Sequence, residues 1–267
     1  MTDGHIHLDI RDHISTVTID RPGKRNALST EMRVDLLKML READCSDRVR
    51  VIIVTGAGGD FCAGGDIHVL RELKNADDEA GFARLLDDGK EIVALLREST
   101  KPTIAMVDGV AAGAGFLIAM ACDLRMAGEH AKFGLPFVRL GLGPDWGGTY
   151  LLPRLLGTAK ALELLYTGEP IDANEAQRIG LVNRIWPAAE LTEQTRRLAA
   201  RLASGPTAVM ARYKRAIHAT WDASFETTAG IERQLQLENF RGPDCAEGIA
   251  AFLEKRAPRF GPLPHRP

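Results

Sequence analysis

Apolar residues along this chain form short continuous runs separated by stretches with helical spacing. The runs Val49–Val54 and Thr103–Val107 are nearly unbroken, which is typical of strands buried on both faces. Residues 14–19 predict an earlier and less regular strand. Between these runs, Met32, Leu36 and Leu40 recur every four residues after a Ser29/Thr30 cap and predict a helix. Strands that alternate with helices favour an α/β core with parallel pairing.

The pattern changes after about residue 186, where the strand signals stop. Four helical periods follow, at Leu191, Thr195, Leu198 and Leu202, then Met210, Tyr213 and Ile217, then Ile231 and Leu235, and last Ile249, Phe252 and Leu253. We therefore expect a core over residues 1–205 and a helical region over residues 206–267. Such a region can pack on a neighbouring subunit or fold back on its own core.

Composition narrows the class of protein. The chain has 267 residues, 45% of them hydrophobic, and a net charge of −2 with both signs interspersed. This balance gives no basic footprint for nucleic acid or for an anionic membrane. The four cysteines have no metal-site spacing, so we expect no metal, and no apolar run is long enough to span a membrane. The start of the chain lacks the pattern of a signal peptide, and the expected location is cytoplasmic.

Two turns rich in small residues carry the strongest chemical signal. They are Phe61–Ile67 and Gly109–Gly115, and the apolar segment 116–121 after the second turn predicts a buried helix. Small residues let backbone N–H groups approach a ligand closely. Two such groups from separate turns could hold one carbonyl oxygen as it becomes an oxyanion, although close helix–strand packing alone also explains such turns.

One acid follows these turns. Asp145 stands before Trp146-Gly147-Gly148, so it could cap the next helix or transfer a proton. Asp66 has the same ambiguity, and there we favour the cap.

Taken together, these segments resemble the enoyl-CoA hydratase/isomerase (crotonase) superfamily over nearly the whole chain. The matching segments are Arg21–Leu28, Phe61–Ile67, Lys101–Ala105, Gly109–Gly115, Ala121–Asp123, Ala131–Gly134, Gly147–Thr149, Thr167-Gly168, Ala176, Gly180–Val182 and Phe252–Arg256. The resemblance implies a spiral of β-β-α repeats followed by a C-terminal helical trimerisation region. It also implies an acyl-CoA thioester as substrate and a homotrimer or a dimer of trimers.

The resemblance assigns roles to individual positions. The N–H groups of Gly65 and Ala114, the latter after Gly113, would form an oxyanion hole. The other positions expected to contact the thioester substrate are Arg25, Ala27, Ala63, Asp66, Ile67, Gly113, Leu117, Phe137, Trp146, Phe252 and Lys255. Phe252 and Lys255 match a C-terminal segment that can reach coenzyme A, often on a neighbouring subunit.

The chain departs from the family pattern where the chemistry would occur. Hydratases of the family carry two glutamates, and the matching positions here hold Leu117 and Phe137, which cannot transfer a proton. The acid is instead Asp145, eight positions after Phe137 and followed by Trp146. This arrangement resembles the epoxyphenylacetyl-CoA isomerase branch most and the aryl-CoA dehalogenases next.

The sequence therefore predicts an acyl-CoA isomerase in which Asp145 acts as acid and base on a thioester enolate, without a metal or redox cofactor. Burial between Phe137, Trp146 and Leu117 is expected to raise the pKa of Asp145 toward neutrality. Three alternatives remain open. They are hydration by a non-standard route, nucleophilic substitution of an aryl-CoA at Asp145, and a non-catalytic acyl-CoA binding protein.

Overall fold

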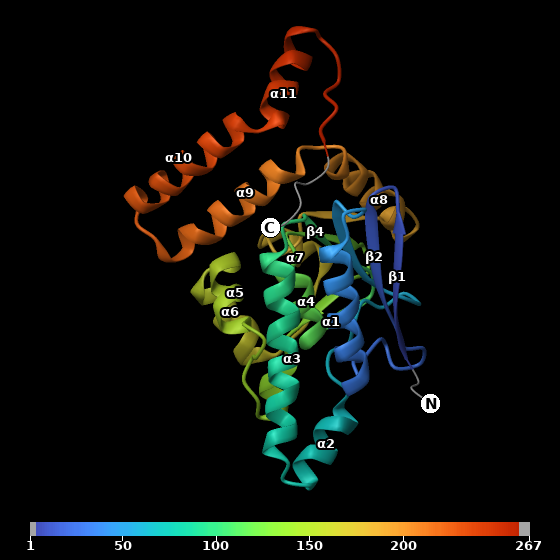
Figure 1. Cartoon of the computed structure of the whole chain (residues 1–267). Coiled ribbons are helices and arrows are strands. Elements are labelled where there is room, and N and C mark those ends of the chain that lie inside the picture. The colour runs from blue at the N-terminus through green and yellow to red at the C-terminus, as the bar shows by residue number, and fades with distance from the viewer. Residues whose placement is uncertain (1–3, 262–267) are drawn as a thin grey trace.

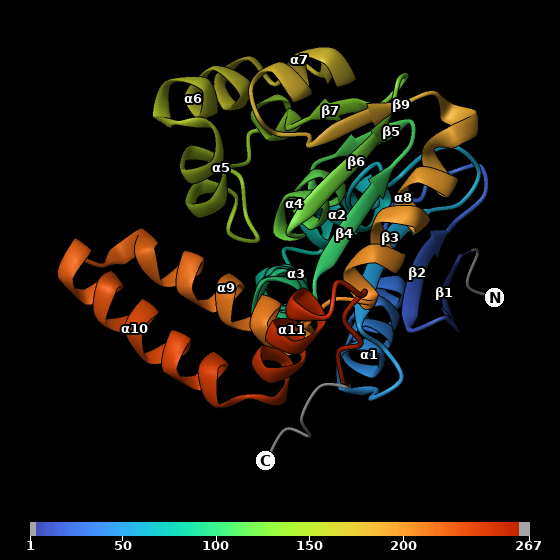
Figure 2. The same cartoon turned by 90° about the horizontal axis from the view of Figure 1, so that it is seen from above.

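The strands form one large sheet and one small sheet. The computed structural model describes residues 4–261. The large sheet has the order β1-β2-β3-β4-β6-β9 (Figure 1, Figure 2). Its strands are β1 (His5–Arg11), β2 (Ile14–Asp20), β3 (Val51–Gly56), β4 (Thr103–Val107), β6 (Leu124–Gly128) and β9 (Arg184–Trp186). The small sheet has the order β5-β7-β8, with β5 (Val110–Ala112), β7 (Lys132–Gly134) and β8 (Ile171–Asp172).

The large sheet is parallel except at one edge. The strands from β2 to β9 pair in parallel, and every residue of Val51–Thr55 in β3 is buried. This confirms the predicted parallel α/β core. The edge strand β1 pairs antiparallel with β2 and was not predicted, although Ile6, Leu8 and Ile10 alternate along it. The small sheet was also missed, because two- and three-residue strands leave no periodic signal.

Helices cover both faces of the large sheet. On one face, α1 (Thr30–Cys45) packs against β1, β2 and α3 (Glu79–Glu98), while α2 (Ile67–Asn75) joins the lower end of α3. On the other face lies α8 (Ala188–Ala203), as Figure 2 shows. The Ser29 hydroxyl accepts a hydrogen bond from the Met32 amide and caps α1, whose residues Met32, Leu36 and Leu40 are buried. This confirms the predicted helix and its cap.

The helix α4 (Ala114–Ala121) runs through the core, and all of its residues are buried. The Phe116 ring meets the Phe133 ring edge-on at a centroid distance of 6.1 Å. This confirms the buried helix predicted after the second turn. Within residues 4–261, no helix combines the length and the apolarity that crossing a membrane requires.

A further group of helices lies beside α4. It consists of η1 (Pro136–Leu140), α5 (Gly148–Leu156), α6 (Thr158–Thr167) and α7 (Ala173–Arg178). Because α5 packs against α4, the loop that enters α5 is held near the beginning of α4. That loop carries Asp145.

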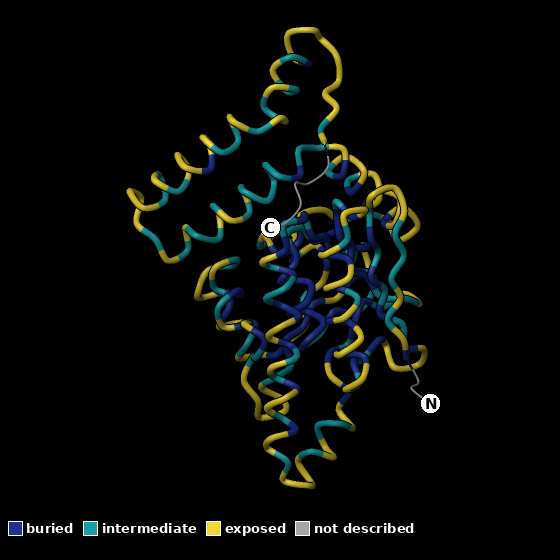
Figure 3. Tube along the Cα trace, viewed as in Figure 1, coloured by how far each residue is buried: buried dark blue, intermediate teal, exposed yellow. Residues whose placement is uncertain are grey.

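The C-terminal helices form an arm that extends from the core (Figure 1). They are α9 (Thr207–Ala219), η2 (Thr220–Asp222), α10 (Phe225–Arg241) and α11 (Pro243–Leu253). The Lys214 ammonium donates to the Leu96 carbonyl and pairs with Asp123, so α9 is tied to the core. Figure 3 shows that α10 and α11 are largely exposed or half-buried.

Large apolar side chains stay exposed along this arm. They are Tyr213, Ile217, Phe225, Leu237, Phe240, Ile249, Phe252 and Leu253. The predicted boundary between residues 205 and 206 falls at the turn before α9, while residues 1–3 and 262–267 lie outside the described residues. An oligomerisation role for the arm stays a prediction.

Candidate active site

The backbone of the first turn leaves the Gly65 amide free. Leu28 bridges to Gly65 in parallel, but the bonds run from the Leu28 amide to the Gly64 carbonyl and from the Asp66 amide to the Leu28 carbonyl. A residue whose neighbours make the ladder bonds points its own N–H away from the partner segment. Among the described residues, the Gly65 amide has no hydrogen-bond acceptor.

The second turn offers a matching amide at the N-terminus of α4. Ala114 is the first residue of α4, so its N–H has no partner within the helix. Gly113, which precedes it, has φ +51°, a conformation that favours glycine. The positive end of the α4 dipole lies at this same point.

The two turns lie in direct contact. A Cβ atom added to Gly64 would lie 2.9 Å from the Ala112 carbonyl oxygen and 3.4 Å from the Ala114 nitrogen. A Cβ atom added to Gly115 would lie 2.1 Å from the Cys62 carbonyl oxygen. Small residues are therefore required here for close approach, and Gly65 and Ala114 both line one cavity.

This cavity has a volume of about 110 Å³ and contains Asp145 in its wall. Apart from Asp145 and Arg33, its side chains are apolar, and the largest belong to Leu70, Phe82, Leu85, Phe137, Leu140 and Trp146. Burial raises the pKa of the Asp145 carboxyl to about 6, against the weaker lowering effects of its own backbone amide and of the Arg33 charge. The predicted upward shift of this pKa is confirmed in direction.

Asp145 does not cap the following helix. The cap position of α5 is Gly147, with φ +79°, and no side chain bonds to it. Asp145 contributes only its backbone carbonyl, which accepts from the Gly148 amide at 2.7 Å. The capping interpretation of Asp145 is therefore wrong, and its carboxylate remains available to the cavity.

Trp146 holds the Asp145 loop against α3. The indole ring is buried, and a Cβ atom added to Gly89 in α3 would lie 1.6 Å from the Trp146 Cε2 atom. Trp146 itself has φ +46°, an uncommon conformation for a bulky residue. A glycine within a long helix thus makes room for the ring that positions the acid.

Asp66 and Leu117 support the structure around the cavity. The Asp66 carboxylate accepts from the His68 amide as the cap of α2 and pairs with Arg21 at 2.8 Å, which confirms the predicted cap. Leu117 is fully buried one turn into α4 and is not among the residues that line the cavity. Ala63, Ile67, Gly113 and Phe137 do line it.

A longer groove borders the cavity, and a separate hollow shares no lining residue with it. A groove of about 880 Å³ shares Ile67, Leu70 and Phe82 with it and runs along α2 and the beginning of α3. A separate hollow of about 320 Å³ is lined by Arg25 together with other residues at and after the ends of β2 and β3. Ala27, next to this hollow in sequence, is half-buried.

Phe252 and Lys255 are far from the cavity within one chain. Phe252 lies in α11 and Lys255 directly after it, at the end of the molecule opposite α2 in Figure 1, and both are exposed. The structure therefore does not bring these two residues together with Asp145. Contact with a ligand of a neighbouring subunit stays a prediction for both.

A charged residue of the cavity was missed by the sequence reasoning. Arg33 lies on α1, is 3% exposed, and lines the same cavity as Asp145. The sequence feature that could have identified Arg33 is its place beside Met32 on the buried face of a helix, where a charged residue is unusual.

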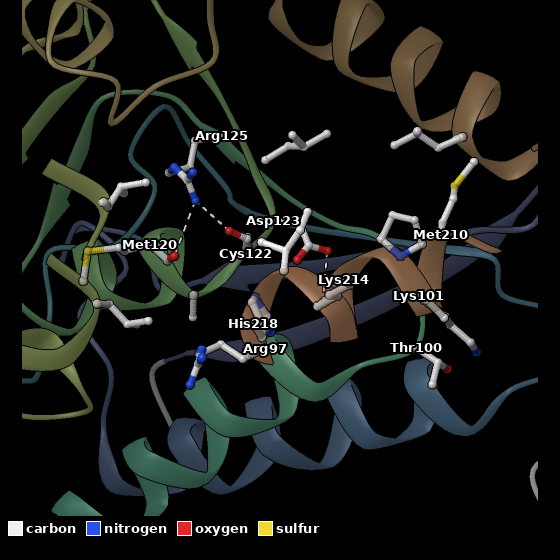
Figure 4. Close-up of a pocket in the computed structure, with 18 of the residues that line it drawn as sticks. Arg97, Thr100, Lys101, Met120, Cys122, Asp123, Arg125, Met210, Lys214 and His218 are labelled. Atoms are coloured by element: carbon white, nitrogen blue, oxygen red, sulfur yellow. Dashed lines mark hydrogen bonds and ion pairs between the residues drawn. The ribbon is translucent and has the colours of Figure 1, made fainter. Parts of the chain in front are cut away.

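A second cavity, of about 410 Å³, lies between α9 and the C-terminal ends of α3 and α4 (Figure 4). Lys214 pairs there with Asp123 at 3.0 Å, and Arg125 donates to the carbonyls of Met120 and Cys122. These charges are satisfied within the protein. Asp145, Gly65 and Ala114 line the other cavity, at the opposite end of α4.

Comparison with known proteins places this geometry in a family. The sequence model of the enoyl-CoA hydratase/isomerase family matches residues 9–262. The chain is 38% identical to a probable enoyl-CoA hydratase of Bacillus subtilis, covering 96% of this chain and 98% of that protein. It is 36% identical to the 1,2-epoxyphenylacetyl-CoA isomerase of Escherichia coli, covering 92% of this chain and 94% of that protein.

Solved structures agree with the sequence comparison. The crystal structure of an enoyl-CoA hydratase from Polaromonas sp. JS666 superposes with a TM-score of 0.92 at 32% identity, covering 96% of this chain and 99% of that one. The fold is therefore the crotonase fold, as the sequence predicted. The chain belongs to the enoyl-CoA hydratase/isomerase family of acyl-CoA-processing enzymes.

Proposed function

We propose that this enzyme isomerises an unsaturated acyl-CoA thioester through an enolate, with Asp145 as acid and base. The observation that carries the proposal is a carboxylate of pKa about 6 in a largely apolar cavity that Gly65 and Ala114 also line. A base whose pKa lies near the working pH combines a large ionised fraction with a useful affinity for the proton.

The proposed reaction moves one proton. The thioester oxygen accepts hydrogen bonds from the Gly65 and Ala114 amides, which makes the protons on the adjacent carbon more acidic. Asp145 takes a proton from C2 of a 3-enoyl thioester, and the C–H electron pair enters the conjugated enolate. The protonated carboxyl then returns the proton to C4, which leaves a 2-enoyl thioester of the same mass. This sequence calls for no metal or redox cofactor.

The apolar wall supports isomerisation over simple hydration. The positions of the two hydratase glutamates hold Leu117 and Phe137, and neither side chain can activate water. Hydration by another route is the second candidate, because several relatives, including that of Bacillus subtilis, are named hydratases. Nucleophilic substitution at Asp145 has less support, because no histidine lines the cavity within residues 4–261. A binding protein without catalysis would not need a carboxylate of raised pKa.

The arm suggests how the substrate would be shared between subunits. We expect the exposed apolar faces of α9–α11 to pack in a homotrimer or a dimer of trimers. In that assembly Phe252 and Lys255 of one subunit would reach the coenzyme A bound by another, beside the hollow lined by Arg25. A lysine ammonium there would pair with a phosphate.

A panel of CoA thioesters tests the proposed function. The purified enzyme is incubated with 2-enoyl, 3-enoyl and phenylacetyl-derived thioesters, and products are identified by mass and absorbance. Isomerisation leaves the mass unchanged and shifts the absorbance, whereas hydration adds the mass of one water. Unchanged thioesters across the whole panel, together with tight binding, would contradict the proposal and favour the binding protein.

A further inference from the structure

Arg33 is a buried cation without a partner. Its side chain is 3% exposed, and its Nε and Nη2 atoms are buried without a hydrogen bond. No ion pair joins the guanidinium to another described residue. Burying an unpaired charge is unfavourable, and no hydrogen bond or ion pair from the described residues offsets that cost at Arg33. Because Arg33 lies in a cavity wall, an anion that enters the cavity can pair with it.

The charged groups around Arg33 do not neutralise it. Asp66, at the cap of α2, is paired with Arg21, and Glu31 is exposed on α1. Burial lowers the pKa of Arg33, and Asp88 on α3 opposes this most among the neighbouring charges, yet no ion pair joins the two. The Cys62 thiol is neutral, because burial raises its pKa to about 12.

Arg33 lies close to Gly65 in the cavity wall. Its Nη1 atom lies 3.5 Å from the place that a Cβ atom on Gly65 would occupy. The guanidinium is therefore beside Gly65, which also lines the cavity. Arg33 and Asp145 are the two charged residues of the wall, and Arg33 is the one charge that acts on the Asp145 carboxyl.

We propose that Arg33 is a catalytic residue that stabilises the enolate oxygen beside Gly65. This inference rests on the proposed function and deepens it, because the reaction itself supplies the anion that the guanidinium lacks. Arg33 keeps its proton throughout, since arginine is not deprotonated in proteins. The substrate proton moves only to and from Asp145, and the negative charge resides on the thioester oxygen between the two transfers. The cation attracts that charge strongly, because the rest of the cavity wall is apolar.

The test measures enolate formation directly. Butyryl-CoA is incubated in D₂O with the full-length enzyme, and deuterium uptake at C2 is followed by mass. Arg33→Met is expected to lower the exchange rate and kcat by about 10²-fold with little change in KM, the scale of losing one oxyanion donor. Arg33→Lys keeps a charge and should stay within about tenfold of wild type. Arg41→Met, at an exposed site on the same helix, is the matched control and should be unchanged.

Two further readouts separate catalysis from packing. Arg33→Met removes an unpaired buried charge, so its melting temperature is expected to match or exceed that of wild type. The acid limb of its pH–rate profile should move to higher pH, because Arg33 lowers the pKa of Asp145, the group it faces.

Three results would overturn the role of Arg33. They are an unchanged exchange rate in Arg33→Met, a rise in KM alone, and a loss of rate that accompanies a fall in melting temperature. If the wild-type enzyme exchanges the C2 proton but isomerises no enoyl-CoA, the proposed function alone is refuted. The exchange rates of the Arg33 variants then still decide whether Arg33 stabilises the enolate. Wild-type enzyme that neither exchanges nor isomerises would overturn both.

Discussion

Replacing Asp145 with asparagine tests the proposed chemistry at its proton-transfer step. Asparagine keeps the size of the side chain and removes its basicity. Proton transfer by a positioned side chain contributes about 10²–10⁴-fold, so Asp145→Asn is expected to lose kcat by that factor. Affinity for the CoA thioester should change little, because the wall and the Gly65 and Ala114 amides remain.

The pH dependence follows from the pKa of the acid. With a pKa of about 6, Asp145 is ionised in roughly one molecule in ten at pH 5 and in roughly nine in ten at pH 7. The wild-type rate should therefore rise about tenfold between these values and level off above pH 7. The residual rate of Asp145→Asn should be flat across that interval.

Stability should move in the opposite direction to activity. The folded pKa of Asp145, about 6, lies above the ordinary value of 3.8. The unfolded chain then loses this proton first, and stability falls as pH rises between the two values and stays lower above them. Asp145→Asn removes that penalty, and its melting temperature at pH 7.5 is expected to equal or exceed that of wild type.

The assay compares turnover of the best thioester in the panel with melting temperature and circular dichroism. Asp87→Asn, an exposed aspartate on α3, is the matched control and should behave as wild type. Wild-type turnover by Asp145→Asn would refute the acid–base role. So would a loss of rate that merely follows a loss of folding.

Other predictions concern the frame of the site and the assembly. Ala114→Pro removes one amide N–H at the first position of α4, where proline fits a helix. It should lower kcat by about 10²–10³-fold and leave the circular dichroism normal. An unchanged kcat would exclude the Ala114 amide as an oxyanion donor. Gly89→Ala places a Cβ 1.6 Å from the Trp146 Cε2 atom, although alanine is the better helix former. Because the ring must shift and displace the Asp145 loop, kcat/KM should fall by about 10²-fold. Full activity would show that the ring can move freely. Light scattering at micromolar concentration should give about three or six times 29.1 kDa, and a monomer would contradict the role of the arm.

The parts of the fold that were predictable have strong local signals. A few neighbouring residues are enough to predict each of three features, which are the buried strand β3, the small-residue turn at Gly113 and the apolar helix α4. Order and spacing of these segments then carried the family resemblance. The resemblance in turn placed Asp145 near Gly65, which periodicity alone does not.

What escaped prediction depends on contacts between distant segments. The helical period marked Met32 and Leu36 as core but gave no reason for a charge at Arg33, because its surroundings come from the Gly65 turn and the Asp145 loop. Leu117 was expected around the acid, yet it is fully buried, packs near Gly148 of α5 and does not line the cavity. The pairing of Asp66 with Arg21 likewise joins two loops that no local pattern connects.

A crystal structure with a bound, non-reacting acyl-CoA analogue tests the central claim most directly. The account predicts that the thioester oxygen lies about 3 Å from both the Gly65 and the Ala114 nitrogen. It also predicts that the Asp145 carboxylate lies within hydrogen-bond reach of the position from which the proton leaves. A thioester oxygen held elsewhere, or an Asp145 carboxylate that faces away from the acyl chain, would contradict the account.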